Sequence, residues 1–161
     1  VGALTYIMKK EEIGIETSSV LVNKFSGLIG ITGIASDMRE IEDQAGEGNE
    51  RAQLGLDMYA YRVKKYIGSY AAALGGADII VFTGGIGENG SDTREDICKE
   101  MEYMGVKIDK EKNNVRSKEQ IISTESSKVK VLVVPTDEEL VIARDTYAII
   151  NELSTINNTV R

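Results

Sequence analysis

Several residue types that carry common chemistry are missing or rare in this sequence. It has no histidine and no tryptophan, and only one cysteine and one proline. Without histidine, these residues cannot form a histidine-based catalytic triad, a histidine–metal centre or a histidine general base. The single cysteine, Cys98, excludes an internal disulfide framework and a cysteine-cluster zinc site. It also suits a reducing compartment, so we expect a cytoplasmic protein.

Long apolar runs and an excess of positive charge are also absent. No run approaches the ~20 apolar residues of a membrane-spanning helix, and the N-terminus lacks a signal-peptide pattern, so we expect no membrane association. The chain has 19 basic and 26 acidic residues, a net charge of −7. Nucleic-acid binders usually present a basic face, so we expect no nucleic-acid partner.

The residues that are present are typical of a globular protein. Apolar residues make up 42% of the 161 residues, which excludes wholesale disorder. At the usual ~150 residues per domain, the length fits one compact domain or a large piece of one. The chain begins at Val1 rather than at a methionine, so we expect that it is processed or belongs to a longer polypeptide.

The strongest periodic signal predicts one long helix over residues 49–74, with Gly75-Gly76 as its C-cap. Its apolar residues recur at steps of three or four, which places them on one face. We interpret this stripe, tyrosines included, as core or subunit packing rather than as a ligand-stacking surface. The stripe consists of Ala52, Leu56, Tyr59, Val63, Tyr66, Tyr70 and Leu74.

Two short apolar runs, residues 77–83 and 128–134, predict buried parallel strands. A turn and a helix follow each run, over residues 91–104 and 136–153. Strand–turn–helix therefore occurs twice, and the predicted fold class is α/β with a long central helix.

The N-terminal part is expected to contain helices over residues 3–12, 17–24 and 37–45, the last capped by Ser36. Between residues 26 and 36 a glycine occurs at every third position, which predicts a tight loop with short extended pieces.

The C-terminal part is expected to hold a short strand at 106–109 and an exposed loop over 110–128, with one extended piece at 120–123. The pattern Thr136-Asp-Glu-Glu139 predicts a capping box at the start of the last helix. Residues 154–161 are expected to form a frayed tail.

The informative motif is the glycine-rich turn Thr83-Gly-Gly-Ile-Gly-Glu-Asn-Gly90 after the first strand. Glycines between a strand and a helix expose backbone N–H groups and let a phosphate or nucleotide approach closely. A P-loop is rejected, because no lysine stands between Gly90 and Ser91. The alternative is a dinucleotide-binding module of Rossmann type. Its fingerprint would be Gly85, Gly87 and Gly90, with Asp109 as the acidic residue beyond, although Glu88 would oppose a pyrophosphate.

The turn Phe82-Thr-Gly-Gly-Ile-Gly-Glu-Asn89 closely resembles the nucleotide-binding loop of the acetate/propionate kinase family. The stretch Asn23-Lys-Phe-Ser-Gly-Leu-Ile-Gly-Ile-Thr-Gly33, with Ser36-Asp-Met-Arg39, resembles an earlier nucleotide loop of that family. Gly48-Asn-Glu-Arg-Ala-Gln53 resembles its long helix and Pro135-Thr-Asp-Glu-Glu-Leu-Val-Ile-Ala-Arg144 its C-terminal helix. The resemblance covers residues 2–150 in the family's order.

This resemblance implies a partial actin-like, sugar-kinase (ribonuclease H-like) nucleotide-binding domain. Residues 1–153 would be the C-terminal portion of a two-domain, dimeric enzyme that uses ATP and Mg²⁺ to convert acetate to acetyl phosphate and ADP. Glu138 matches the family's magnesium-associated glutamate. The implied nucleotide contacts are Asp37, Met38, Arg39, Gly85, Ile86, Gly87, Glu88 and Asn89.

The residues themselves leave other interpretations open. Arg39 also fits a solvent-exposed or paired helix arginine, and Asn89 a left-handed turn position. If Glu139 belongs to the capping box, Glu138 stays free at the helix start, where a carboxylate commonly pairs with the helix dipole.

The family's catalytic aspartate, its histidine and its two phosphoryl-stabilising arginines belong to an earlier half that this sequence does not contain. We therefore expect no catalytic residues here and negligible kinase activity from this chain alone. Besides the dinucleotide-binding module, a stand-alone folding or dimerisation piece that binds no nucleotide remains an alternative.

Overall fold

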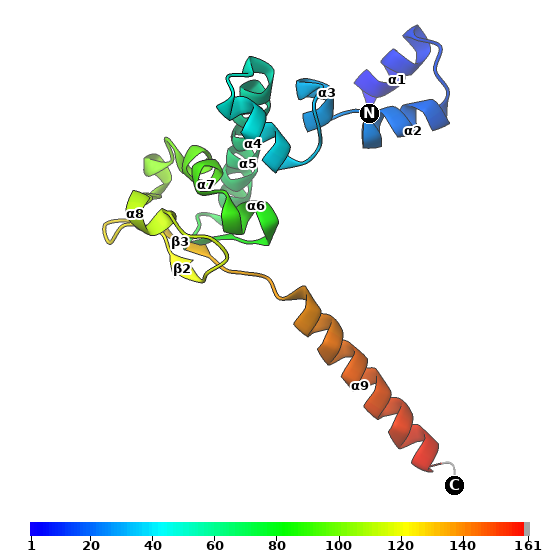
Figure 1. Ribbon diagram of the computed structural model, residues 1–161, viewed down its shortest axis with the longest axis vertical. Coiled ribbons are helices and arrows are strands. Elements are labelled where there is room, and N and C mark those ends of the chain that lie inside the picture. The colour runs from blue at the N-terminus through cyan, green and yellow to red at the C-terminus, as the bar shows by residue number, and fades with distance from the viewer. Residues whose placement is uncertain (160–161) are drawn as a thin grey trace.

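The core lies between a small sheet and the helices that cover one of its faces. The computed structural model describes the backbone of residues 1–159 and the side chains of residues 1–151 (Figure 1). Strands β1 (Ile79–Phe82), β3 (Lys130–Val133) and β2 (Gln120–Ile121) form the sheet in the order β1-β3-β2. β1 and β3 pair in parallel, as the two apolar runs predict, and β2 pairs antiparallel with β3.

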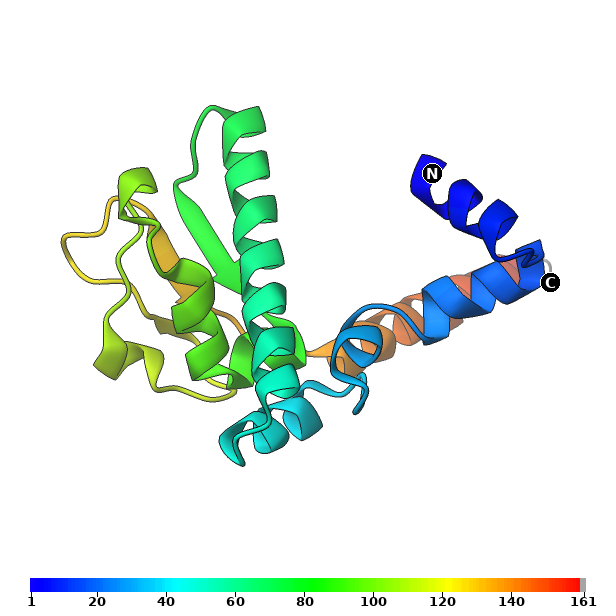
Figure 2. The ribbon, with the colours of Figure 1, turned by 90° about the horizontal axis from the view of Figure 1, so that it is seen from above.

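The sheet buries only one face among the described residues. Ile80 and Phe82 of β1 and Val131 and Val133 of β3 point into the core, where they meet side chains of α5 (Glu50–Leu74) and α7 (Ser91–Cys98). Figure 2 shows both helices beside the sheet. The alternate β1 residue Val81 is 50% exposed. In this chain the sheet is therefore covered on one face only, and its strands alternate between buried and more exposed residues.

The long helix α5 confirms the predicted element and both of its ends. Asn49 caps the start, because its Oδ1 accepts from the backbone N–H groups of Arg51 and Ala52. Gly75 follows the end in the left-handed conformation, as a C-cap glycine should.

The predicted apolar stripe of α5 packs as core only in its first part. Ala52 is buried, and Tyr59 and Val63 pack against the core cluster. Tyr66 and Tyr70 instead stack on each other at the surface, with ring centroids 6.3 Å apart. These tyrosines and Leu74 do not pack in the core of this chain, because the core-facing side of the later turns of α5 runs through Ile67 and Ala71 instead. Subunit packing through these residues stays a prediction.

Three helices precede the core: α1 (Gly2–Lys10), α2 (Ile15–Lys24) and α3 (Leu28–Thr32). α1 and α2 agree with the predicted helices and stand away from the sheet (Figure 2). The loop predicted over residues 26–36 is wrong in part, because α3 forms within it. The glycines Gly27 and Gly33 lie at positive φ on either side of α3, so they bound the helix rather than prevent it.

Helix α4 (Met38–Gly46) begins one residue later than predicted. Asp37, not Ser36, is its N-cap, because the Asp37 Oδ1 accepts from the backbone N–H of Arg39. The glycine-rich turn also differs from the prediction, because residues 84–89 form the short helix α6 (Gly84–Asn89). Hydrogen bonds to distant segments, described below, hold this helix against the low helix propensity of glycine.

After α7 the chain is more irregular than predicted. The helix expected to reach residue 104 ends at Cys98, because Lys99 leaves the helical conformation with a ψ of 135°. Glu100 follows at a φ of +62°, and then comes a 3-10 turn, Glu102–Met104. The strand expected at 106–109 is reduced to isolated bridges. Within the predicted exposed loop, α8 (Lys110–Asn113) forms with Asp109 as its cap, and β2 confirms the extended piece.

The last helix, α9 (Glu138–Thr159), leaves the sheet and projects away from the other elements (Figure 1). The predicted capping box is wrong: Asp137 caps the helix, since its Oδ1 accepts from the Leu140 N–H. α9 also continues through residues 154–159, where a frayed tail was predicted, and residues 160 and 161 lie outside the described residues.

Candidate functional site

A pocket of about 610 Å³ lies between the start of α4 and the glycine-rich helix α6. Figure 2 shows these two helices at the same end of α5. The pocket brings together predicted site residues from two segments that lie far apart in the sequence. Its lining consists of Asp37, Met38, Arg39, Glu42, Gly85, Ile86, Asn89, Gly90 and Arg116.

Asp37 and Arg39 form a forked ion pair at the pocket. The Asp37 Oδ2 accepts from Arg39 Nη2 at 2.8 Å, and its Oδ1 accepts from Arg39 Nε at 3.2 Å. These side-chain bonds, together with the Arg39 backbone N–H, lower the pKa of the Asp37 carboxyl to about 2. The Arg39 side chain is 86% exposed. Arg39 is therefore exposed, as one interpretation expects, but its partner lies two residues before it rather than at the i,i+4 spacing. The same side chain lines the pocket, and its contact with a nucleotide stays a prediction.

Glu88 does not line the pocket, although the resemblance implied a nucleotide contact there. Its buried carboxylate turns back, and Oε1 accepts from the Gly84 N–H at 2.9 Å and from the Thr136 N–H and hydroxyl at 2.8 and 2.9 Å. The bonds from Thr136 are the main cause that lowers the Glu88 pKa. Glu88 thus joins the start of α6 to the segment that enters α9.

Gly87 is also absent from the pocket lining, and the close packing around it explains why glycine stands there. A Cβ at this position would lie 3.2 Å from the backbone carbonyl carbon of Phe82. At Gly85, by contrast, a Cβ would meet nothing within 4 Å, so this glycine leaves open space on the pocket side.

A buried arginine of α7, which sequence reasoning missed, is hydrogen-bonded to the glycine-rich helix α6 and to the loop after α8. Arg94 of α7 has no exposed surface, and burial lowers the pKa of its guanidinium. Its Nη1 donates to the Gly87 carbonyl at 2.9 Å. Its Nε and Nη2 donate to the side chain and carbonyl of Asn113, and Nη2 also donates to the Val115 carbonyl. The sequence offers no signal for this clamp, since a charged residue in a polar helix normally faces solvent.

The end of α6 is tied to a second loop. Asn89 donates from Nδ2 to the Gly85 carbonyl at 2.9 Å, and its Oδ1 accepts from the Ser117 hydroxyl at 2.9 Å. Its carbonyl accepts from Arg116 Nε at 3.2 Å. Asn89 is helical, so the left-handed interpretation is wrong; Ser117 has the positive φ instead.

Sequence reasoning missed two pocket residues, Glu42 and Arg116, and named a third, Gly90, only for the dinucleotide-binding alternative. Glu42 sits one turn after Arg39 on α4, and its carboxylate accepts from the Thr93 hydroxyl at 3.2 Å. The helical spacing from residues 38 and 39 is the signal that could have found Glu42. Arg116 comes from the segment predicted to be an exposed loop, and no local pattern connects it to the turn.

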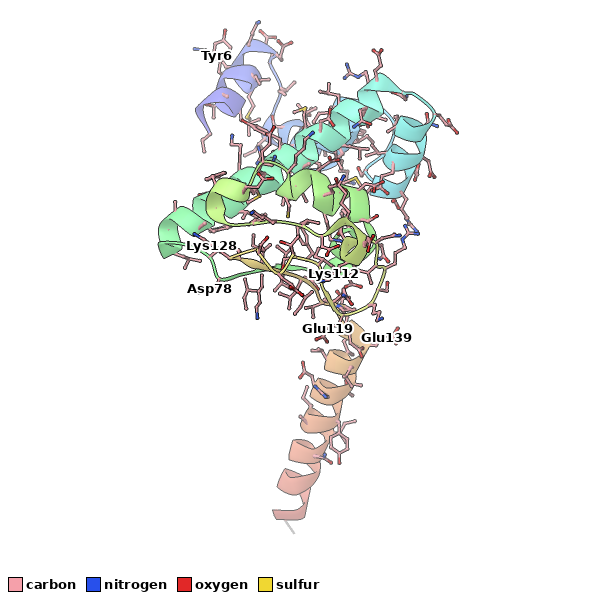
Figure 3. All side chains as sticks on the ribbon, turned by 90° about the vertical axis from the view of Figure 1, so that its left-hand side faces the viewer. Tyr6, Asp78, Lys112, Glu119, Lys128 and Glu139 are labelled. Atoms are coloured by element: carbon pink, nitrogen blue, oxygen red, sulfur yellow. The ribbon has the colours of Figure 1, made fainter. Side chains whose placement is uncertain are left out.

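Glu138, the predicted metal ligand, is exposed at the start of α9 and does not line the pocket. Figure 3 shows its neighbour Glu139 where α9 leaves the sheet. Within residues 1–151, no group of three or more acidic or cysteine side chains is arranged to hold a metal ion. A single carboxylate fits Mg²⁺ that is held mainly by water and by the phosphates of a nucleotide.

The Rossmann-type alternative finds no support in the structure. Asp109, its acidic residue, caps α8 by accepting from the Glu111 and Lys112 N–H groups and does not line the pocket.

A search of the described helices for a membrane-spanning segment finds none that combines the length and the apolar character that a span requires.

Comparison with known proteins identifies the family. Residues 1–144 match the Acetokinase family. The chain is 58% identical to acetate kinase of Phocaeicola vulgatus over 151 residues, which are 94% of this chain and 38% of that protein. It is also 58% identical to acetate kinase of Bacteroides thetaiotaomicron, again over 94% of this chain and 38% of that protein.

Solved structures agree with this assignment. The fold matches the crystal structure of Porphyromonas gingivalis acetate kinase with a TM-score of 0.86 and 53% identity, over 92% of this chain and 38% of that one. It matches a propionate kinase from Francisella tularensis with a TM-score of 0.79 and 35% identity, over 88% and 36%. The chain thus spans little more than a third of the length of these relatives, and the predicted actin-like α/β class is confirmed.

Proposed function

This chain belongs to the acetokinase family, and from that premise we propose that it is the C-terminal portion of an acetate kinase. The complete enzyme would transfer a phosphoryl group reversibly between ATP and acetate, giving acetyl phosphate and ADP. The observation that carries the proposal is the pocket that joins Asp37, Met38 and Arg39 to Gly85, Ile86 and Asn89.

The pocket would hold the nucleotide as one wall of a larger cleft. Its volume of about 610 Å³ lies within the range usual for small-molecule sites. Ile86 and the buried Met38 offer apolar contact for a base, and the open space at Gly85 admits close approach. The guanidinium plane of Arg39, already oriented by Asp37, is suited to stacking on a base or to hydrogen bonding.

Glu138 would help to hold the magnesium ion of a Mg–nucleotide complex. Thr136 is tied through Glu88 to the first residue of α6, so the start of α9 is anchored beside the glycine turn. When bound, Mg²⁺ would neutralise part of the negative charge of the phosphates. Glu138 needs to supply only one carboxylate, directly or through a water molecule.

The residues that complete phosphoryl transfer would lie outside this chain, so the chain alone is expected to be inactive. Acetate or another short-chain carboxylate would bind in that other part. A homodimer and a cytoplasmic location are also proposed. The exposed tyrosines Tyr66 and Tyr70 and the 79%-exposed Leu74 give α5 an apolar surface suited to subunit packing.

Thermal unfolding of the 161-residue chain tests the nucleotide site. We expect MgADP to raise Tm, NAD to leave it unchanged, and Arg39→Ala to remove most of the MgADP effect. Arg144→Ala, which removes an exposed arginine of α9 far from the pocket, should keep it. Stabilisation by NAD instead of MgADP would favour the dinucleotide module, and no effect of either would favour a folding piece that binds no nucleotide.

A second assay tests the expected inactivity. Acetyl phosphate formation from acetate and MgATP by the wild-type chain should equal that of Glu138→Ala, at background level. Turnover clearly above this variant would show that the chain carries catalytic groups of its own.

A further inference from the structure

Arg116 is the cation of the pocket that the proposed function leaves without a role. It reaches the pocket from the loop after α8, and its Nε donates to the Asn89 carbonyl. The neighbouring Ser117 fixes the loop, donating from its hydroxyl to the Asn89 Oδ1 and from its N–H to the Glu88 carbonyl. Within the described part of the chain, the two Nη groups of Arg116 form no hydrogen bond or ion pair, and only Nε is bonded.

The other charged groups of the pocket already have partners. Arg39 is paired with Asp37, and Glu42 accepts from Thr93. Among the described residues, Arg116 is therefore the pocket cation with both Nη groups unbound, whereas Arg39 already uses Nη2 to hold Asp37. Because guanidinium donors are planar and fixed, they select a ligand with two adjacent acceptors in one plane.

The two ends of α6 indicate which part of a nucleotide Arg116 meets. The start of α6 is joined through Glu88 to Thr136, two residues before the proposed metal ligand Glu138, so the phosphates belong at that end. Asn89, Gly90 and Arg116 lie at the opposite end of α6. The base therefore belongs at Arg116.

The Asn89 amide is held in one orientation, because its Nδ2 donates to the Gly85 carbonyl and its Oδ1 accepts from Ser117. Each end keeps capacity for one further hydrogen bond. The Nη groups of Arg116, which have no partner among the described residues, offer a two-donor fork to the base edge. Guanine presents O6 and N7 as adjacent acceptors for such a fork, whereas adenine places the N6 donor beside N7.

We propose, on the basis of the proposed nucleotide site, that Arg116 is a base-contacting specificity residue. Its Nη groups donate to the O6 and N7 edge of a 6-oxopurine, so the pocket accepts guanine nucleotides as well as adenine nucleotides. The preference for one base over the other then depends on Arg116.

Titration calorimetry of the 161-residue chain with MgADP and MgGDP tests this role. Arg116→Ala should weaken GDP binding about tenfold, within the range for a bidentate guanidinium–guanine pair, and ADP binding less than about threefold. Arg116→Lys should behave like Arg116→Ala toward GDP, because an ammonium keeps the charge but lacks the fork. The control Lys118→Ala removes a nearby exposed cation outside the pocket and should change neither affinity.

The possible results separate the two proposals. Equal loss of ADP and GDP affinity in Arg116→Ala, or none, overturns the specificity role while the nucleotide site stands. Restoration of GDP binding by Arg116→Lys also overturns it, because charge alone would then suffice. If the wild-type chain binds neither nucleotide, the proposed site and the role of Arg116 both fail. Circular dichroism and Tm of each variant show whether it is folded.

Discussion

Replacing Arg94 with methionine tests whether the glycine turn depends on a buried clamp. The guanidinium is fully buried and donates four hydrogen bonds, to the Gly87 carbonyl, the side chain and carbonyl of Asn113, and the Val115 carbonyl. Methionine keeps a similar length and an apolar stem but removes every donor. The acceptors would stay behind in a site that water reaches poorly, and unsatisfied buried acceptors are costly.

The expected loss of stability follows from these bonds. At about 1 kcal/mol net per hydrogen bond, four bonds give about 4 kcal/mol. The Gly87 and Val115 carbonyls are only partly buried and can bind water in part, so we expect Arg94→Met to lower the free energy of unfolding by about 3 kcal/mol. That is a large share of the roughly 5–15 kcal/mol that stabilises a typical domain.

Urea unfolding, followed by circular dichroism, measures this loss as a shift of the midpoint at constant slope. The control Arg144→Met changes an exposed arginine and should stay within about 0.5 kcal/mol of wild type. Because Arg94→Met could fail to fold, Asn113→Ala provides a milder variant, expected to cost about 1–2 kcal/mol. A loss below about 1 kcal/mol in Arg94→Met, with a native-like spectrum, would refute the clamp.

Further predictions concern the turn, the pocket and the lone cysteine. Gly87→Ala should destabilise the chain by about 1–3 kcal/mol in urea unfolding, because its Cβ would press on the preceding strand. Gly85→Ala has free space and should keep that stability while weakening MgADP binding in calorimetry. The Asp37 carboxyl should titrate near pH 2 by NMR, and its pKa should rise in Arg39→Ala. Since the folded pKa is the lower one, the stabilisation from this pair is complete above about pH 4 and disappears as the pH falls toward 2. Burial raises the pKa of Cys98 to about 12, so native protein at pH 8 should resist thiol reagents that label the chain in urea.

The elements that could be predicted from the sequence are those whose signal is local and repeated. The two parallel strands and α5 follow from runs and spacings of apolar residues, which act over a few positions. The N-cap residues of the helices are harder to predict, because Ser36 and Asp37 are adjacent and either side chain can cap α4. At the last helix, Asp137 takes the cap while the Thr136 hydroxyl binds Glu88, 48 residues away in the sequence. No local pattern distinguishes these outcomes.

The residues of the candidate site also differ in whether a local sequence signal predicts them. The residues at 37–39 and 85–89 stand out by their composition and by their resemblance to a known family. Arg94 and Arg116 do not, because their roles depend on carbonyl groups that the chain brings close only after folding. The polar first turns of α7 pack against the core through Arg94, a buried cation whose donors bond to backbone or amide oxygens.

These long-range bonds indicate how the part of the proposed nucleotide site that this chain holds can be ordered by the chain itself. Glu88 fixes the first residue of α6 to Thr136, Arg94 fixes the Gly87 carbonyl, and Ser117 fixes the Asn89 side chain. Each anchor belongs to this chain, and none requires a ligand. A turn that is already ordered loses little conformational entropy on binding. If the proposed site is correct, weak nucleotide binding by this chain should therefore arise from the contacts of the wall proposed to lie outside it, and not from the cost of ordering the glycine turn.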